Sequence, residues 1–378
     1  MNELIKAYIE KNKEEVIAVH RELCLIPAPS HHEEKRAEFC KNWFHSYGMT
    51  DAYIDEALNV ICPYNAEGKN DLTVFVAHTD TVFPDTDPMP YIDDGEKIFS
   101  PGAGDDTASL TVLMFVARFF YENKVKSGGV LFVANSCEEG LGNLKGTRQI
   151  FKDYEGRVKQ FISFDSSNFN YAADRCVGSC RYSVTVKTKG GHSWGRFGEK
   201  NAIAELSSII NKIYSIDLPV KEGKKVSYNV GGISGGTSVN TIAQEANMLC
   251  EYRSDDEDLL AFMKNKFAEI FEAAKKDDVW VEVELIGERP CAGAVDLNEI
   301  EKLKEIANSV ALEVTGNPLN YKASSTDCNI PLSLAIPALC IGVICGGGAH
   351  TREEFIIKSS FIPGLEIGIK AAIKFANH

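Results

Sequence analysis

The sequence predicts an α/β protein. A doubly wound, mostly parallel sheet forms its main domain, and a ferredoxin-like α+β domain is inserted into it. The first observation is a set of short apolar runs of strand length, which are typical of strands buried on both faces. The second is that helical segments separate several of these runs, as in parallel sheets. The third is a middle segment in which apolar and polar residues alternate, the mark of half-exposed strands. The apolar runs are residues 72–77, 129–135, 161–164 and 338–345.

The segments around these runs are mainly helical. Residues 2–24 carry apolar side chains at helical spacing, and two prolines stop this first helix. Ser30 is placed to cap a second helix over residues 33–47. The remaining expected elements of the main domain are a weaker strand over 52–60, an apolar helix over 107–121 and a closing helix over 366–375.

The middle of the chain predicts the inserted domain. Its elements follow the order β-α-β-β-α-β, which is that of a ferredoxin-like sandwich. We therefore expect a catalytic domain of residues 1–177 and 289–378 and an inserted lid or dimerisation domain of residues 178–288. The glycine-rich stretch 231–236 lacks the context of a phosphate loop and is interpreted as a turn. The expected strands are 180–188, 226–233, 246–253 and 279–286, and the expected helices are 202–216 and 255–275.

Composition excludes several classes of partner. The chain has 378 residues and a formal charge of −14, which argues against nucleic acid or an anionic membrane as the main partner. The opening residues lack the apolar run of a signal peptide, and no later stretch is long enough to span a bilayer. The 11 cysteines show no regular spacing. We therefore expect a cytoplasmic protein whose cysteines stay reduced.

Ionisable residues follow the apolar strands at equivalent positions. Each run of strand length is followed closely by a histidine or a carboxylate, and Asp105 lies at the start of the helix 107–121. A single strand-end histidine usually only forms hydrogen bonds, and a single acidic pair is usually a solvated turn. In a parallel sheet, however, ligands bind beyond the carboxyl ends of the strands, so these groups are expected to converge. The other candidates are His78, Glu138, Glu139, Asp165 and His350.

Such a set of oxygen and nitrogen ligands suits a pair of divalent ions, zinc first and cobalt or manganese next. Two ions about 3.5–4 Å apart need a bridging group, and Asp105 fits because it lies at the helix end. One carboxylate is then left over to act as general base toward a water whose pKa a bound ion lowers to about 7. The expected reaction is hydrolysis of an amide or ester by a metal-bound hydroxide. Cys137 is the alternative nucleophile, but its acidic neighbours disfavour the thiolate, so we interpret it as packing.

An ordered set of motifs resembles a known family. The sequence is similar to the co-catalytic dizinc exopeptidases and amidohydrolases that include peptidase T, aminoacylase, carnosine dipeptidase and glutamate carboxypeptidase, and it is most similar to the peptidase T-like members. The resemblance covers nearly the whole chain. The motifs that carry it are A-H-T-D-T-V at 77–82, G-A-G-D-D-T-A at 102–108, C-E-E-G at 137–140, F-D at 164–165, G-G-H-S at 190–193 and A-H-T-R-E-E-F at 349–355.

The resemblance implies a role for each candidate residue. His78 and Asp165 would hold one zinc ion, Glu139 and His350 the other, and Asp105 would bridge them. It also implies a cis peptide between Asp105 and Asp106. Two residues of the main domain would assist: Glu138 as general base and Asp80, which would orient His78.

The resemblance extends to substrate binding and assembly. It implies a homodimer formed through the inserted domain, whose His192 would stabilise the developing oxyanion in its own or the partner's site. Asn240 and Arg253 would hold a substrate carboxylate, and Ser325 lies in a segment similar to a substrate-binding turn. Two departures concern substrate choice: Asp106-Thr107-Ala108 replaces the usual lysine-glycine sequence, and Trp194 replaces a small residue.

Three functions are compatible with these residues. The preferred hypothesis is a metal-dependent exopeptidase of the tripeptidase, aminopeptidase or dipeptidase type that acts on short peptides. The second is an N-acyl-amino-acid deacylase with the same machinery. The third is an inactive metal-binding interaction protein, which is disfavoured because no ligand and no base is missing.

Overall fold

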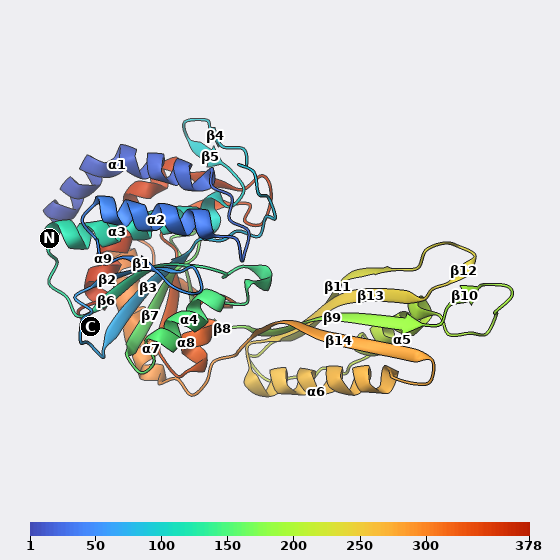
Figure 1. Cartoon of the computed structure of the whole chain (residues 1–378). Helices are drawn as coiled ribbons and strands as arrows, with labels where there is room; N and C mark the ends of the chain where they lie inside the picture. The colour runs from blue at the N-terminus through green and yellow to red at the C-terminus, as the bar shows by residue number, and fades with distance from the viewer. The chain divides into compact units, whose positions relative to one another are not determined.

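The computed structural model describes residues 1–378 and divides them into two compact units. The first consists of Met1–Cys176 and Gly293–His378, and the second of Val177–Ala292. The chain therefore leaves the first unit, builds the second and returns to the first. The second unit runs from green to orange in Figure 1. None of the helices combines the length and the apolar character needed to cross a membrane.

An eight-stranded mixed sheet lies at the centre of the first unit, in the order β1-β2-β6-β3-β7-β16-β8-β15. The four central strands β6, β3, β7 and β16 are parallel neighbours, whereas β2 and β8 join them antiparallel. The predicted parallel sheet is thus confirmed at its centre. The strands are β1 Tyr53–Ile54, β2 Val60–Tyr64, β3 Leu72–His78, β6 Val130–Asn135, β7 Val158–Phe164, β8 Tyr171–Cys176, β15 Asn320–Ser324 and β16 Ala338–Ile341.

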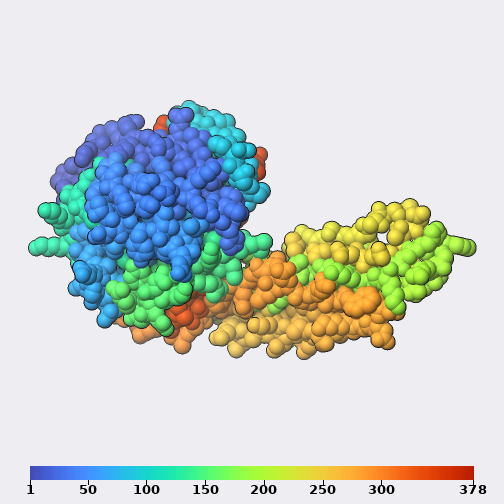
Figure 2. Space-filling model, in the orientation of Figure 1, coloured from blue at the N-terminus to red at the C-terminus, as the bar shows by residue number.

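Helices cover both faces of this sheet, which makes it doubly wound. Phe75 and Ala77 of β3 pack with α1, α2, α3 and α9, while Val74 and Val76 pack with α4 and α8. This alternation explains why the strand is apolar throughout. In Figure 2 the blue N-terminal residues form much of the visible surface of this unit. The helices are α1 Asn2–Cys24, α2 Glu34–Ser46, α3 Ser109–Asn123, α4 Lys145–Asp153, α7 Leu297–Thr315, α8 Asn329–Ser333 and α9 Phe361–Phe375.

A second, small sheet connects two segments that are far apart in the sequence. β18 (Phe355–Ile357) pairs antiparallel with both β5 (Lys97–Phe99) and β17 (Gly346–Gly347), and β4 (Ile92–Asp93) pairs with β5. The sequence did not predict this sheet because its strands are only two or three residues long. It brings the segment leading to Asp105 beside the segment that carries His350.

The second unit is a four-stranded antiparallel sheet in the order β11-β13-β9-β14, with two helices on one face. The sequence of elements along the chain, β-α-β-β-α-β, is the predicted one. The short strands β10 and β12 pair with each other beside it. The elements are β9 Gly178–Thr188, β10 Gly191–His192, α5 Ala202–Ile213, β11 Val226–Gly235, β12 Thr241–Ile242, β13 Glu245–Ser254, α6 Glu257–Ala274 and β14 Val279–Arg289.

Three local predictions are wrong. Ser30 does not cap α2, because the N-cap position of this helix is Glu33; the Ser30 hydroxyl donates to Asp80 Oδ2 at 2.6 Å. The single strand expected over 52–60 is replaced by two short strands, β1 and β2, which pair side by side and antiparallel. The glycine-rich stretch 231–236 lies mostly within β11, where its irregularity appears as a bulge after Val230.

Candidate metal centre

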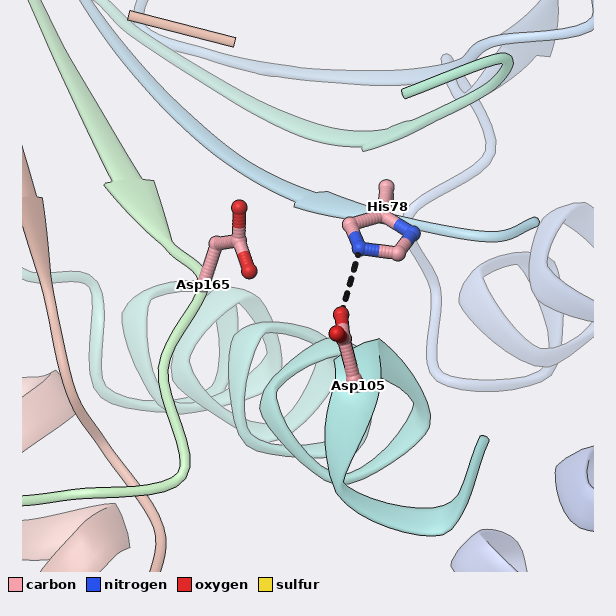
Figure 3. A group of neighbouring side chains, drawn as sticks. All are labelled: His78, Asp105 and Asp165. Atoms are coloured by element: carbon pink, nitrogen blue, oxygen red, sulfur yellow. Dashed lines mark hydrogen bonds and ion pairs between the residues drawn. The ribbon is translucent and has the colours of Figure 1, made fainter. Parts of the chain in front are cut away.

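His78 is the last residue of β3, and both nitrogens of its buried ring have partners. Nδ1 lies 3.0 Å from the backbone oxygen of Asp80, which can only accept, so Nδ1 carries the proton. Nε2 lies 3.1 Å from Asp105 Oδ1, as Figure 3 shows. In the neutral ring this nitrogen has a lone pair, so it is the one that can bind a cation.

Asp105 lies between two imidazole rings. Its Oδ1 is 3.1 Å from His78 Nε2 and its Oδ2 is 3.2 Å from His350 Nε2. The backbone here is non-helical, the Asp105–Asp106 peptide is cis as predicted, and α3 begins only at Ser109. Asp106 turns the other way and accepts the backbone N–H of His78 at 3.0 Å. Asp105 is therefore the aspartate of the pair that faces the histidines.

The remaining candidates complete two groups around Asp105. One group is His78, Asp105 and Asp165, with Asp165 following β7 (Figure 3), and the other is Asp105, Glu139 and His350. Within each group the ligand atoms lie within 4.8 Å of one another. Glu139 Oε1 lies 3.0 Å from His350 Nε2. A third group of the same kind contains His78, Glu138 and Glu139.

Electrostatics in these groups favour the binding of cations. Burial and the charge of Asp105 raise the pKa of Asp165 to about 7. Hydrogen bonds to Asp105 and Glu139 raise the pKa of His350 to about 10. Burial opposes a charge on His78, yet hydrogen bonds to Asp105 and Asp80 raise its pKa well above the usual value. The raised pKa values mean that protons neutralise part of the negative charge of these carboxylates. Divalent ions would neutralise this charge more completely, so the donor set fits two such ions.

The model of peptidase family M20/M25/M40 matches residues 74–374. The chain belongs to this family. It is therefore a hydrolytic enzyme, and the family is metal-dependent.

Individual M20/M25/M40 relatives are distant. A peptidase M20 domain-containing protein of Schizosaccharomyces pombe is 27% identical over 61% of this chain, and the match spans only 58% of that protein. The succinyl-diaminopimelate desuccinylase of Corynebacterium glutamicum is 22% identical, over 94% of this chain and 95% of the relative. The crystal structure of aminopeptidase PepT from Bacillus cereus has a TM-score of 0.73 at 20% identity, covering 97% of this chain and 99% of that chain. This likeness shows the fold alone.

Asp80 has a larger role in this M20/M25/M40 site than the sequence indicated. Its carboxylate lies 3.5 Å from His78 Nδ1, but its two oxygens also accept the backbone N–H groups of Glu138 at 2.9 Å and Glu139 at 3.0 Å. Burial opposes ionisation, but the hydrogen bonds lower the pKa of Asp80. One buried carboxylate thus ties the loop after β3 to the loop after β6.

Two more buried carboxylates support the site and were not among the predicted residues. Asp327 accepts hydrogen bonds from Asn135 Nδ2 at 2.6 Å and from Thr147 Oγ1. Glu354 accepts three backbone N–H groups from residues 102–105. Glu354 lies inside the motif A-H-T-R-E-E-F quoted above, and Asp327 lies two residues after Ser325, in S-S-T-D at 324–327, but the sequence does not indicate that they point inward.

Cys137, the alternative nucleophile, does not have the environment of a reactive thiol. It is buried, and its sulfur lies 3.3 Å from the Glu33 carboxylate. Burial and the charge of Glu33 raise the pKa of the thiol, which keeps it protonated. The interpretation of Cys137 as a packing residue agrees with this environment.

The predicted substrate-binding residues lie in both units. Ser325 follows β15 in the first unit, whereas His192, Asn240 and Arg253 belong to the second. His192 is exposed on β10; its Nδ1 accepts from the backbone N–H groups of residues 194 and 195 at 3.2 and 3.3 Å, and Asn240 O accepts from Ser193 N at 3.0 Å. Arg253 forms two hydrogen bonds to Glu251, at 2.8 and 3.0 Å. The role of each in substrate binding remains a prediction.

Proposed function

We propose that this enzyme is a two-metal exopeptidase that hydrolyses the amide bond of short peptides, with zinc as its first candidate metal and cobalt or manganese as the next. The observation that carries the proposal is the position of Asp105. One carboxylate with a different imidazole at each oxygen is the arrangement that a bridging ligand requires.

The surrounding residues divide into two sets. His78 and Asp165 would hold one ion, Glu139 and His350 the other, and Asp105 both. When bound, the ions would polarise the carbonyl of the scissile amide and lower the pKa of water. The protein's part is to hold these ligands rigidly, which the backbone hydrogen bonds of the β3 and β6 loops achieve.

Glu138 is the residue proposed as general base. It is buried, it precedes a ligand, and its backbone N–H is held by Asp80. Its carboxylate would take a proton from the attacking water and pass it to the nitrogen of the leaving amine, so that each product leaves neutral at the cleaved bond. Glu139 is aimed at His350 instead, which is why the two adjacent glutamates have different roles.

Residues of the inserted unit also have roles in this proposal. The backbone N–H groups at His192 Nδ1 favour the tautomer with a proton on Nε2, so the exposed ring presents an N–H donor suited to a developing oxyanion. Asn240, Arg253 and Ser325 would bind the polar end of the substrate. A homodimer formed through this unit and a cytoplasmic location belong to the same proposal.

The second candidate is an N-acyl-amino-acid deacylase. A relative named succinyl-diaminopimelate desuccinylase, similar over most of both chains, favours keeping this alternative. Both reactions hydrolyse an amide bond, so the metal ligands and Glu138 do not distinguish them.

A substrate screen tests both candidates. Dipeptides, tripeptides and N-acetyl and N-succinyl amino acids are incubated with purified protein, and the released amine is measured. We expect the highest kcat/KM for a di- or tripeptide, loss of turnover after treatment with a chelator, and recovery on adding Zn²⁺, Co²⁺ or Mn²⁺. A preference for acylated amino acids would select the deacylase, and turnover that persists after metal removal, verified by elemental analysis, would contradict the two-metal mechanism.

A further inference from the structure

Glu354 is a buried carboxylate beside the metal centre that is not one of the candidate ligands. It lies four residues after His350 and directly before β18, and only 2% of its surface is exposed. Its Oε2 accepts the backbone N–H of Gly102 at 2.9 Å. Its Oε1 accepts the N–H groups of Gly104 at 2.7 Å and Asp105 at 2.8 Å.

These three N–H groups belong to the turn that presents Asp105. The turn precedes α3 and has non-helical backbone angles at Asp105, so the helix itself does not order it. Buried N–H groups need a partner, and a charged acceptor forms the strongest hydrogen bonds to them. The Glu354 carboxylate therefore determines where the Asp105 backbone lies.

The main chain of Glu354 adds to this connection. Its oxygen accepts the N–H of Ser100 at 3.1 Å, next to the pairing of β5 with β18. Its N–H donates to Thr351 O at 3.3 Å, and Thr351 N donates to Gly348 O at 3.0 Å, which closes the turn around His350. The residue is thus joined to both ligand-bearing segments.

We propose that Glu354 is a positioning residue that holds Asp105 and His350 at the separation required by the metal ion they share. This inference rests on the proposed two-metal function. Glu354 contacts the backbone of the ligand segments rather than the cation. Its loss would therefore weaken metal binding by displacing Asp105 and His350, although every ligand residue is still present in the chain.

The test compares Glu354→Gln with Glu353→Gln in the full-length chain. The glutamine keeps the size of the side chain, but its NH₂ group would face at least one of the three backbone donors. Glu353 is the adjacent exposed glutamate, so its substitution changes the same charge without touching residues 102–105. Metal-free protein is titrated with Co²⁺, and bound metal is followed by visible absorption and elemental analysis.

We expect wild type and Glu353→Gln to bind two ions alike. Glu354→Gln should bind the weaker ion roughly 10- to 100-fold less tightly, with kcat restored toward wild type by excess Co²⁺. A purely stabilising role would lower the melting temperature equally with and without metal, whereas a positioning role also reduces the increase that metal causes. Glu354→Asp, which keeps the charge but is one methylene shorter, is measured in the same way in case the glutamine variant does not fold.

Two failures can be told apart. If a folded Glu354 variant binds both ions like wild type, the positioning role is wrong while the proposed function stands. If wild-type protein itself does not bind two ions, the two-metal function is wrong.

Discussion

The carboxyl ends of the parallel strands and the paired short strands β10 and β12 hold their polar side chains in opposite ways. At the strand ends, His78 and Asp80 are buried and every polar atom quoted above has a partner. On β10 and just before β12, His192 and Asn240 are exposed, and they are ordered by backbone groups and by the Ser238 hydroxyl. Burial of charge is costly unless it is compensated, so the buried strand ends need a partner for each polar group, whereas the exposed side chains can use water instead.

The largest effect on turnover is expected at the strand ends, because the proposed general base Glu138 lies there. Glu138→Ala should lower kcat by roughly 10³-fold or more, because general-base catalysis contributes about 10²–10⁴-fold. Metal content should remain two ions per chain, measured by elemental analysis, because Glu138 is not needed to hold them. Wild-type turnover by this variant would remove Glu138 from the mechanism.

Replacement of His192 tests the exposed region of β10 and β12. His192→Ala should fold normally, retain both metals and lower kcat by roughly 10²-fold, the usual effect of losing one oxyanion donor. Because the ring is exposed, the free energy of unfolding should change by less than about 0.5 kcal/mol. His32→Ala, another exposed histidine, is the matched control. An unchanged rate would make His192 an ordinary surface residue.

Replacement of Asp80 tests how much the buried hydrogen bonds at the strand ends contribute to the free energy of unfolding. In Asp80→Asn an NH₂ group replaces an oxygen that accepts a backbone N–H of Glu138 or Glu139, so we expect a loss of about 1–3 kcal/mol in the free energy of unfolding. Urea unfolding measures this loss. The exposed Asp87→Asn should differ from wild type by less than about 0.5 kcal/mol. Equal stability of the two variants would mean that the Asp80 hydrogen bonds contribute little.

The smallest expected effect is the pH dependence of the chelator-treated protein. His350 has a folded pKa raised to about 10, so the folded state holds a proton that the unfolded state releases above about pH 6.5. This contribution to stability is complete below about pH 6.5 and is lost as the pH rises toward 10. Metal-loaded protein should show a weaker loss, because ligands bind cations in their deprotonated form. If the urea midpoint changes with pH in the same way with and without metal between about pH 6.5 and 10, this account is wrong.

Elements with strong apolar patterns were predictable. The strands β3 and β6 are buried on both faces, so most of their residues are apolar and the pattern is clear. The amphipathic helix α7 and the two- or three-residue strands of the small sheet were not predicted. Ser30 illustrates a different limit: its sequence context favours a helix cap, but α2 begins after Glu33, and the Ser30 hydroxyl donates to Asp80, which is distant in sequence.

The sequence by itself determined the parallel core, the inserted β-α-β-β-α-β unit and which residue types gather where strands end. These follow from periodicity and from the rule that strand carboxyl ends share one edge of a sheet. Only the tertiary structure decided that Asp105 faces two histidines, that Asp80 holds two backbone N–H groups and that Glu354 joins two segments. Those contacts link residues far apart in the chain, and hydrogen-bond partners at that separation are chosen by how the elements pack rather than by local pattern.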